Sequence, residues 1–142
     1  MPVNQITNPA EATEANVSAL FTAPFVATGA ITKGDAVQLV TAVTSTLPFK
    51  VKKAVITANF LVIGIATKTV ATGTLVTVVT YGPAQALVKT NVVKGDPVLQ
   101  TGVNAGRVKT TAVPILAKTI GVALQTKTTA VTALVWIYVE HA

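Results

Sequence analysis

The sequence has no cysteine, a single histidine and only two serines. Without cysteine, the chain offers no thiolate nucleophile, zinc knuckle or iron–sulfur site. The one histidine, His141, is the penultimate residue, and chain ends fray, so it would be a poor general base. A serine–histidine–aspartate triad would have to use this same residue. We therefore expect a non-enzymatic protein with no cofactor and no bound metal.

Charged residues are also scarce, at 11% of the chain, whereas hydrophobic residues make up 51%. This balance argues against disorder, which needs low hydrophobicity and high charge. No apolar run approaches the roughly 18 residues of a spanning helix, and the best one, Val131–Val139, is about half as long. The N-terminus lacks the basic and apolar regions of a signal peptide. We expect a protein without a membrane partner, of a size that suits one domain.

The few charges are distributed unevenly. Residues 1–30 carry Glu11 and Glu14 and no basic residue, which gives −2. The remainder carries all eleven basic residues against three acidic ones, which gives +8 and a total of +6. An acidic leader thus precedes a basic body, and such a leader can lie along a basic surface.

Threonine and valine dominate the chain from residue 26 onward. β-Branched side chains fit a pleated surface, and glycine-rich turns separate short runs of them. The clearest expected strands are Ala36–Val40, Thr74–Val79 and Arg107–Thr111. The spacing favours a sandwich or barrel rather than βαβ units. We predict an all-β domain over residues 26–142.

The leader, residues 1–25, differs from this body. Asn8, Pro9 and Glu11 stand at the positions of a helix N-cap, first turn and capping box. A helix of about two turns is marginal in water by itself. We therefore predict an N-terminal arm that is either extended or a short helix, and that needs a surface to dock on.

Three pairs of similar segments recur in the same order, offset by 61, 57 and 59 residues. They are Ile31–Val37 with Val92–Val98, Ile63–Ala66 with Ile120–Ala123, and Leu75–Val78 with Leu134–Ile137. A unit near 60 residues that occurs only twice predicts two β-lobes or half-barrels rather than a solenoid. Gly64 and Gly121, inside strand-like runs, indicate bulges or close backbone approach.

The first pair contains the tripeptide Lys-Gly-Asp twice. It resembles an adhesion motif, and Asp35 with Asp96 could form a carboxylate pair. A repeated turn explains the matched positions better, because Gly34 and Gly95 can supply the turn and the aspartates can accept backbone hydrogen bonds. We therefore interpret Gly34, Asp35, Gly95 and Asp96 as structural turn residues.

Two further clusters allow more than one interpretation. Lys50, Lys52 and Lys53 form the only basic cluster, which is either a nucleic-acid patch or a solvated loop or edge strand. Nucleic acid is the less favoured partner, because stacking aromatics are few. Trp136 and Tyr138 alternate on the last strand and share one face, which is typical of core or subunit-interface packing and less so of a carbohydrate platform.

The order of these pieces resembles the small β-rich decoration, or cement, proteins of tailed bacteriophage capsids. The segments that carry the resemblance, across roughly residues 20–140, are Leu20–Pro24, Gly29–Val37, Ile63–Ala66, Gly73–Val78, Lys94–Val98 and Ile120–Ala123. The resemblance implies a compact β-barrel or β-tulip-like domain on the outer surface of the expanded capsid. It also implies a homotrimer whose N-terminal arms clamp neighbouring major capsid subunits, in a virion protein made in the host cytoplasm.

A protein that binds only the assembled shell stabilises that shell by mass action. For shell contact we single out the hydrophobic residues of the otherwise polar leader, which are Val3, Ile6, Pro9, Phe21 and Phe25. The phenylalanines could instead anchor the leader to its own body. The alternative functions are a small basic nucleic-acid-binding barrel and another virion surface or fibre-base module.

Overall fold

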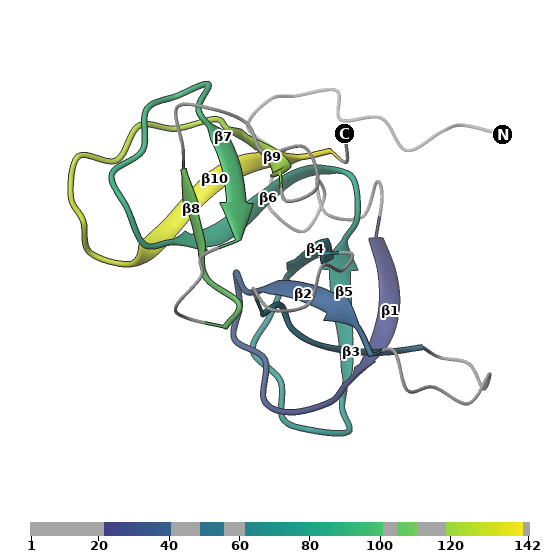
Figure 1. Ribbon diagram of the computed structural model, residues 1–142. Coiled ribbons are helices and arrows are strands. Elements are labelled where there is room, and N and C mark those ends of the chain that lie inside the picture. The colour runs from purple at the N-terminus through teal and green to yellow at the C-terminus, as the bar shows by residue number, and fades with distance from the viewer. Residues whose placement is uncertain (1–21, 41–48, 56–61, 101–104, 111–118, 141–142) are drawn as a thin grey trace, which may run out of the picture.

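The computed structural model describes residues 22–40, 49–55, 62–100, 105–110 and 119–140. In these residues the regular elements are strands (Figure 1). They are β1 (Thr22–Ala27), β2 (Ala36–Leu39), β3 (Lys50–Lys53), β4 (Val62–Ala66), β5 (Leu75–Val79), β6 (Gly82–Val88), β7 (Pro97–Gln100), β8 (Val108–Thr110), β9 (Thr119–Ala123) and β10 (Ala133–Val139). The all-β prediction is confirmed, and the three clearest expected strands coincide with β2, β5 and β8.

The strands form two closed five-stranded barrels, β1 to β5 and β6 to β10. We call them the first and the second barrel, and Figure 1 shows them as two lobes joined where β5 leads into β6. Both have the same cyclic order: the first strand pairs parallel with the third and antiparallel with the fifth. The two lobes that the repeat predicts are therefore present, and, in place of one barrel over residues 26–142, each unit of about 60 residues closes on itself.

The N-terminal boundary also differs from the expectation. β1 begins at Thr22 and pairs with β5 from Thr22↔Val79 to Val26↔Leu75, so the strand includes the last residues assigned to the arm of residues 1–25. The short β-branched and aromatic run at this point satisfies its backbone by pairing with β5, which a free arm could not do. The helix-start signal at Asn8 lies outside the described residues.

Small and large side chains alternate between neighbouring strands inside the second barrel. On β6 three of the four buried positions are glycine or alanine, and on β10 the buried residues are larger: Ala86 faces Val135, and Ala84 faces Ile137. Pairing a small with a large residue fills the narrow interior of a barrel with few strands. The outward positions of β10 therefore include Trp136 and Tyr138, which are half-buried and lie outside the barrel core.

One glycine in each barrel lies very close to the backbone of the neighbouring strand. A Cβ on Gly64 would lie 2.0 Å from the Val79 carbonyl oxygen, and a Cβ on Gly121 would lie 1.9 Å from that of Tyr138. Both glycines face a register shift in the neighbouring strand, after Val37 in β2 and after Val98 in β7. Close backbone approach at these glycines, opposite a bulge, therefore occurs at equivalent places in the two barrels.

The Lys-Gly-Asp segments form the same turn twice. Gly34 and Gly95 have φ of 90° and 94°, a left-handed conformation that favours glycine. The Asp35 carboxylate accepts a hydrogen bond from the Thr32 amide at 2.8 Å, and that of Asp96 accepts one from the Val93 amide at 3.0 Å. Each turn places its aspartate at the start of β2 or β7.

Candidate interaction surfaces

The two barrels meet around Asp35, whose side chain is fully buried. Its carboxylate forms an ion pair with Arg107 of the second barrel and a second one, at 3.4 Å, with Lys53 of its own barrel. A buried carboxylate is costly unless it is paired and hydrogen-bonded, and here it has two cations and the Thr32 amide. Asp35 therefore fixes how the barrels join, and it is not a candidate for acid–base chemistry.

Backbone hydrogen bonds complete this junction. The Ala36 amide donates to the Gly106 carbonyl at 2.7 Å, the Gly106 amide to the Ala54 carbonyl at 2.9 Å, and the Leu87 amide to the Gly34 carbonyl at 2.9 Å. A Cβ on Gly106 would lie 2.7 Å from the Asp35 carboxyl carbon, so glycine at this position allows the close approach. The junction is thus ordered by both charge and backbone pairing.

Asp96 occupies the same place in the second barrel, but its surroundings differ. It is half-buried, and among the described residues no cation lies within ion-pair distance of it. An added Cβ on Gly95 would meet nothing within 4 Å, whereas one on Gly34 would meet Leu134 at 2.6 Å. Identical sequence motifs therefore have one buried and one solvent-facing copy, and the two aspartates do not form a carboxylate pair.

The basic cluster lies on β3, which is paired with β1 on one side and β2 on the other. The interpretation as a loop or edge strand is therefore wrong, because the barrel closes on both sides of this strand. Lys50 is exposed, Lys52 is half-buried, and Lys53 contacts Asp35. Engagement of Lys53 in the junction leaves less of this cluster available for a nucleic-acid backbone.

The outward face of β10 carries an aromatic group. The rings of Tyr138 and Tyr81 meet edge to face at a centroid distance of 5.6 Å, and Tyr81 is 45% exposed. The side-chain hydrogen bond with Tyr81, followed by desolvation and nearby negative charge, raises the pKa of Tyr138 above its ordinary value. The Trp136 amide donates to the Gln125 side-chain oxygen at 2.9 Å. Aromatic side chains with polar tips are common at protein interfaces.

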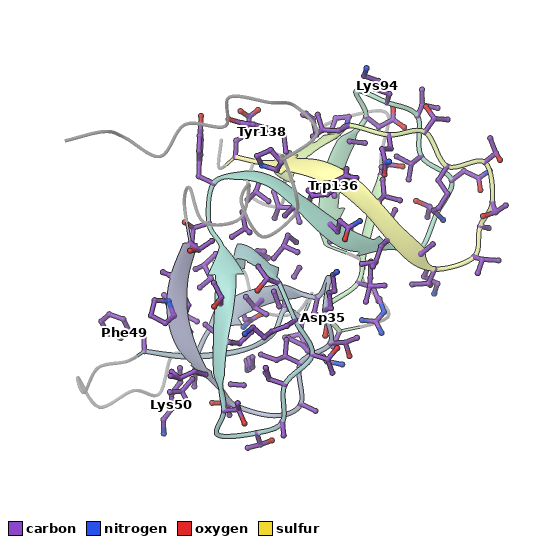
Figure 2. All side chains as sticks on the ribbon, turned by 180° about the vertical axis from the view of Figure 1, so that it is seen from behind. Asp35, Phe49, Lys50, Lys94, Trp136 and Tyr138 are labelled. Atoms are coloured by element: carbon purple, nitrogen blue, oxygen red, sulfur yellow. The ribbon has the colours of Figure 1, made fainter. Side chains whose placement is uncertain are left out.

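The first barrel exposes a second apolar group at the opposite end. Leu75 on β5 is 56% exposed, and Phe49, just before β3, is 47% exposed. Val26 on β1 lies between them, because it pairs with Leu75 on one side and with Lys50 on the other. Figure 2 shows Phe49 and Lys50 together at this end of the molecule.

The predicted arm residues are only partly placed. Phe25 lies on β1, half-buried, and packs against the core of the first barrel. This position agrees with the alternative that the phenylalanine anchors the leader to its own body. Val3, Ile6, Pro9 and Phe21 lie outside the described residues, as does His141. Their contact with a shell stays a prediction.

Arg107, which pairs with Asp35 where the barrels join, is a residue that the sequence interpretation missed. It is the only arginine among eleven basic residues, and arginine is favoured in buried ion pairs because its planar fork binds carboxylates. The presence of a single arginine is the sequence feature that points to this ion pair. In the described part of the chain, no three histidine, cysteine, aspartate or glutamate side chains are grouped so that they could hold a metal ion. No helix within those same residues has the length and apolar character needed to span a bilayer.

No family model matches the chain, and no curated protein matches it. Among solved structures, it is similar to the head fiber gp8.5 N base of bacteriophage phi29, with a TM-score of 0.60 and 17% sequence identity. The match covers 84% of this chain and 92% of that chain. At this identity the similarity concerns the fold, so the paired-barrel architecture of this chain is one that a phage head fiber domain also has.

Proposed function

We propose that this protein is a non-enzymatic structural component of a bacteriophage virion that binds the outer surface of the assembled capsid. The observation that carries the proposal is the similarity of fold to a phage head fiber base over 84% of the chain. The ordered motifs of the sequence, which resemble capsid decoration proteins, support the same class of protein independently.

The proposed mechanism is binding by contact alone. The barrels supply a rigid body, held together by the Asp35–Arg107 junction, and the N-terminal leader supplies a segment that docks on the shell. We assign the shell contacts to Val3, Ile6, Pro9 and Phe21, and the anchoring of the leader to Phe25. A homotrimer would carry three leaders, and simultaneous engagement raises the effective affinity without new kinds of contact.

Two roles on the shell are compatible with this proposal. A cement protein bridges neighbouring major capsid subunits and stabilises the shell, whereas a fibre base mainly attaches a projecting structure. The second role is favoured by one observation: the match covers 92% of a domain that is described as a fiber base. The two roles differ in whether binding raises the temperature at which the shell dissociates.

The test is co-sedimentation with emptied, expanded capsids of the phage that encodes the protein, compared with unassembled major capsid protein. We expect the protein to pellet with capsids and not to bind the free subunits, because the site is formed by assembly. Calorimetry of the decorated capsid then separates cement from fibre base. Absence of the protein from the capsid pellet, at every salt concentration tried, would contradict the proposal.

Binding to DNA tests the alternative that the protein binds nucleic acid. Binding to a DNA fragment that falls steeply with added salt, and that weakens when Lys50 and Lys52 are replaced, would favour the alternative. We expect no such binding, because Lys53 is engaged with Asp35, and the single exposed ring of Phe49 beside Lys50 is not a series of stacking partners.

A further inference from the structure

The junction between the barrels joins two different faces. The first barrel contributes the Asp35 turn and the outward side chains of Ile65 and Val79, which belong to the apolar cluster of the second barrel. We call this the docking face. The second barrel contributes Arg107 and a pair of leucines, Leu87 and Leu134, against which Gly34 packs. We call this the receiving face.

Because both barrels have the same strand order, each face has a twin. The pairing of Ile65 with Val79 corresponds to that of Val122 with Tyr138, so the second barrel has its own docking face, with Asp96. The pairing of Leu87 with Leu134 corresponds to that of Val26 with Leu75. Val51 in β3 and Val108 in β8 occupy equivalent pairing positions. The residues before them, Lys50 and Arg107, are therefore equivalent too. The first barrel thus has its own receiving face, with Lys50.

Described residues cover these twins only in part. On the second docking face, Tyr138 is half-buried and packs edge to face on Tyr81, which is itself 45% exposed. Gly95 and its turn on the same face are exposed, and Val93 beside it is 61% exposed. On the first receiving face, Leu75 is 56% exposed, compared with 39% for its counterpart Leu134. Figure 2 places Lys94 at one end of the molecule and Lys50 with Phe49 at the other, with Asp35 between them. One copy therefore cannot join its own free faces.

We propose that the free docking face of one copy binds the free receiving face of a second copy, head to tail. The faces are complementary in charge, because Asp96 stands where Asp35 stands and Lys50 stands where Arg107 stands. Both are apolar around that charge: Val122, Tyr138 and Pro97 on one, and Leu75, Val26 and Phe49 on the other. A head-to-tail contact closes into a ring when its rotation allows, and otherwise extends as a filament.

The contact between copies differs from the internal junction in its backbone bonds. Pro97 has no amide to donate where Ala36 donates to Gly106, and the Val26 amide already donates to the Phe49 carbonyl at 2.9 Å. Phe49 stands at the position equivalent to Gly106. The carboxylate of Asp96 would therefore approach Lys50 beside an aromatic side chain. The association therefore depends on apolar packing and one ion pair. It is weaker than the internal junction, whose two barrels are held together in one chain. It requires no capsid, so its failure and the failure of the proposed function are distinguishable.

The first test is a disulfide trap in the full-length protein, which has no cysteine of its own. Two variants, Lys50→Cys and Asp96→Cys, are oxidised separately and as a mixture. We expect a cross-linked dimer in the mixture and little in either variant alone. Thr129→Cys, at an exposed position of the β9–β10 loop outside both faces, replaces Asp96→Cys in the matched control mixture. A mixture no better linked than this control overturns the proposal, and so does efficient linking of Asp96→Cys with itself.

The second test reverses the charges without trapping. Lys50→Glu and Asp96→Lys should each weaken self-association in sedimentation velocity about fivefold or more, since a pair is lost and like charges are opposed. In the double variant Lys50→Glu/Asp96→Lys every head-to-tail contact again pairs an acid with a base, so association should recover to near the unmodified level. Association that is unchanged by either single variant, or that fails to recover in the double variant, overturns the head-to-tail contact.

Discussion

The carboxylate of Asp35 in the first barrel accepts a hydrogen bond from the guanidinium of Arg107 in the second barrel, 72 residues away in sequence. The aspartate is fully buried, whereas the Arg107 side chain is 25% exposed. The charge of the aspartate can be held there only because cations and an amide surround it. This ion pair, together with the backbone hydrogen bonds of the junction, holds two separately closed barrels in a defined arrangement.

Replacing Arg107 by alanine should destabilise the protein. The buried Asp35 would retain Lys53 at 3.4 Å but lose its arginine partner, and we expect a loss of about 2 to 3 kcal/mol in the free energy of unfolding. Urea denaturation measures this loss. The control is Lys109→Ala on the same strand, which should change stability by about 0.5 kcal/mol or less. Equal effects of the two variants would contradict the account of the junction.

Adding a methyl group at Gly64 or Gly121 should destabilise strongly. The new Cβ would lie about 2 Å from a backbone carbonyl oxygen of the next strand, which cannot move without opening the barrel. We expect each alanine variant to lose about 3 kcal/mol.

Gly29→Ala is the matched control for this prediction. Its φ is 87°, but an added Cβ meets nothing within 4 Å, so only backbone strain of about 1 kcal/mol is expected. Thermal or urea unfolding of the three alanine variants measures their losses of stability and separates a steric clash from backbone strain. A Gly121→Ala variant no less stable than Gly29→Ala would show that the strands do not approach this closely.

The raised pKa of Tyr138 makes stability depend on alkaline pH. Folding favours the neutral phenol, chiefly through its hydrogen bond with Tyr81, so this contribution is fully present below pH about 10 and is lost as the pH rises through the folded pKa. Tyr138→Phe should therefore flatten the fall in stability above pH about 10.

Ultraviolet titration provides the direct readout, because the chain has two tyrosines. In Tyr81→Phe only Tyr138 remains to ionise, and its pKa should move down toward the ordinary value. An unchanged titration of Tyr138 in that variant would show that the hydrogen bond is not the cause.

Deleting residues 1–19 should separate folding from shell binding. β1 begins at Thr22, so the truncated chain keeps both barrels and should show the circular dichroism and the unfolding midpoint of the full chain. Binding to capsids should be abolished, because the leader carries the proposed contacts. Capsid binding at full strength by the truncated protein would move the contact from the leader to the barrels.

Much of the fold could be predicted because its signals are local. The β-branched runs and glycine turns predicted strands that coincide with β2, β5 and β8, and Gly64 and Gly121 indicated the close approach that the structure has. Closure of each repeat into a barrel of its own could not be predicted, because it depends on pairing between strands far apart in sequence, such as β1 with β3.

The sequence pattern also could not predict that the two aspartates have different surroundings. Asp35 and Asp96 have the same neighbours along the chain and accept the same local amide hydrogen bond. Only the packing of one barrel on the other buries Asp35 against Arg107. The same packing decides which apolar faces remain exposed, and so which surfaces are candidates for partners.

Cryo-electron microscopy of the virion shows whether the protein lies on the outside of a phage capsid, as proposed. We expect density on the outer surface that accommodates two adjacent five-stranded barrels per copy, with the β1 end linked to the shell. Density for the protein in the capsid interior, or a virion that lacks the protein, would contradict the proposed location.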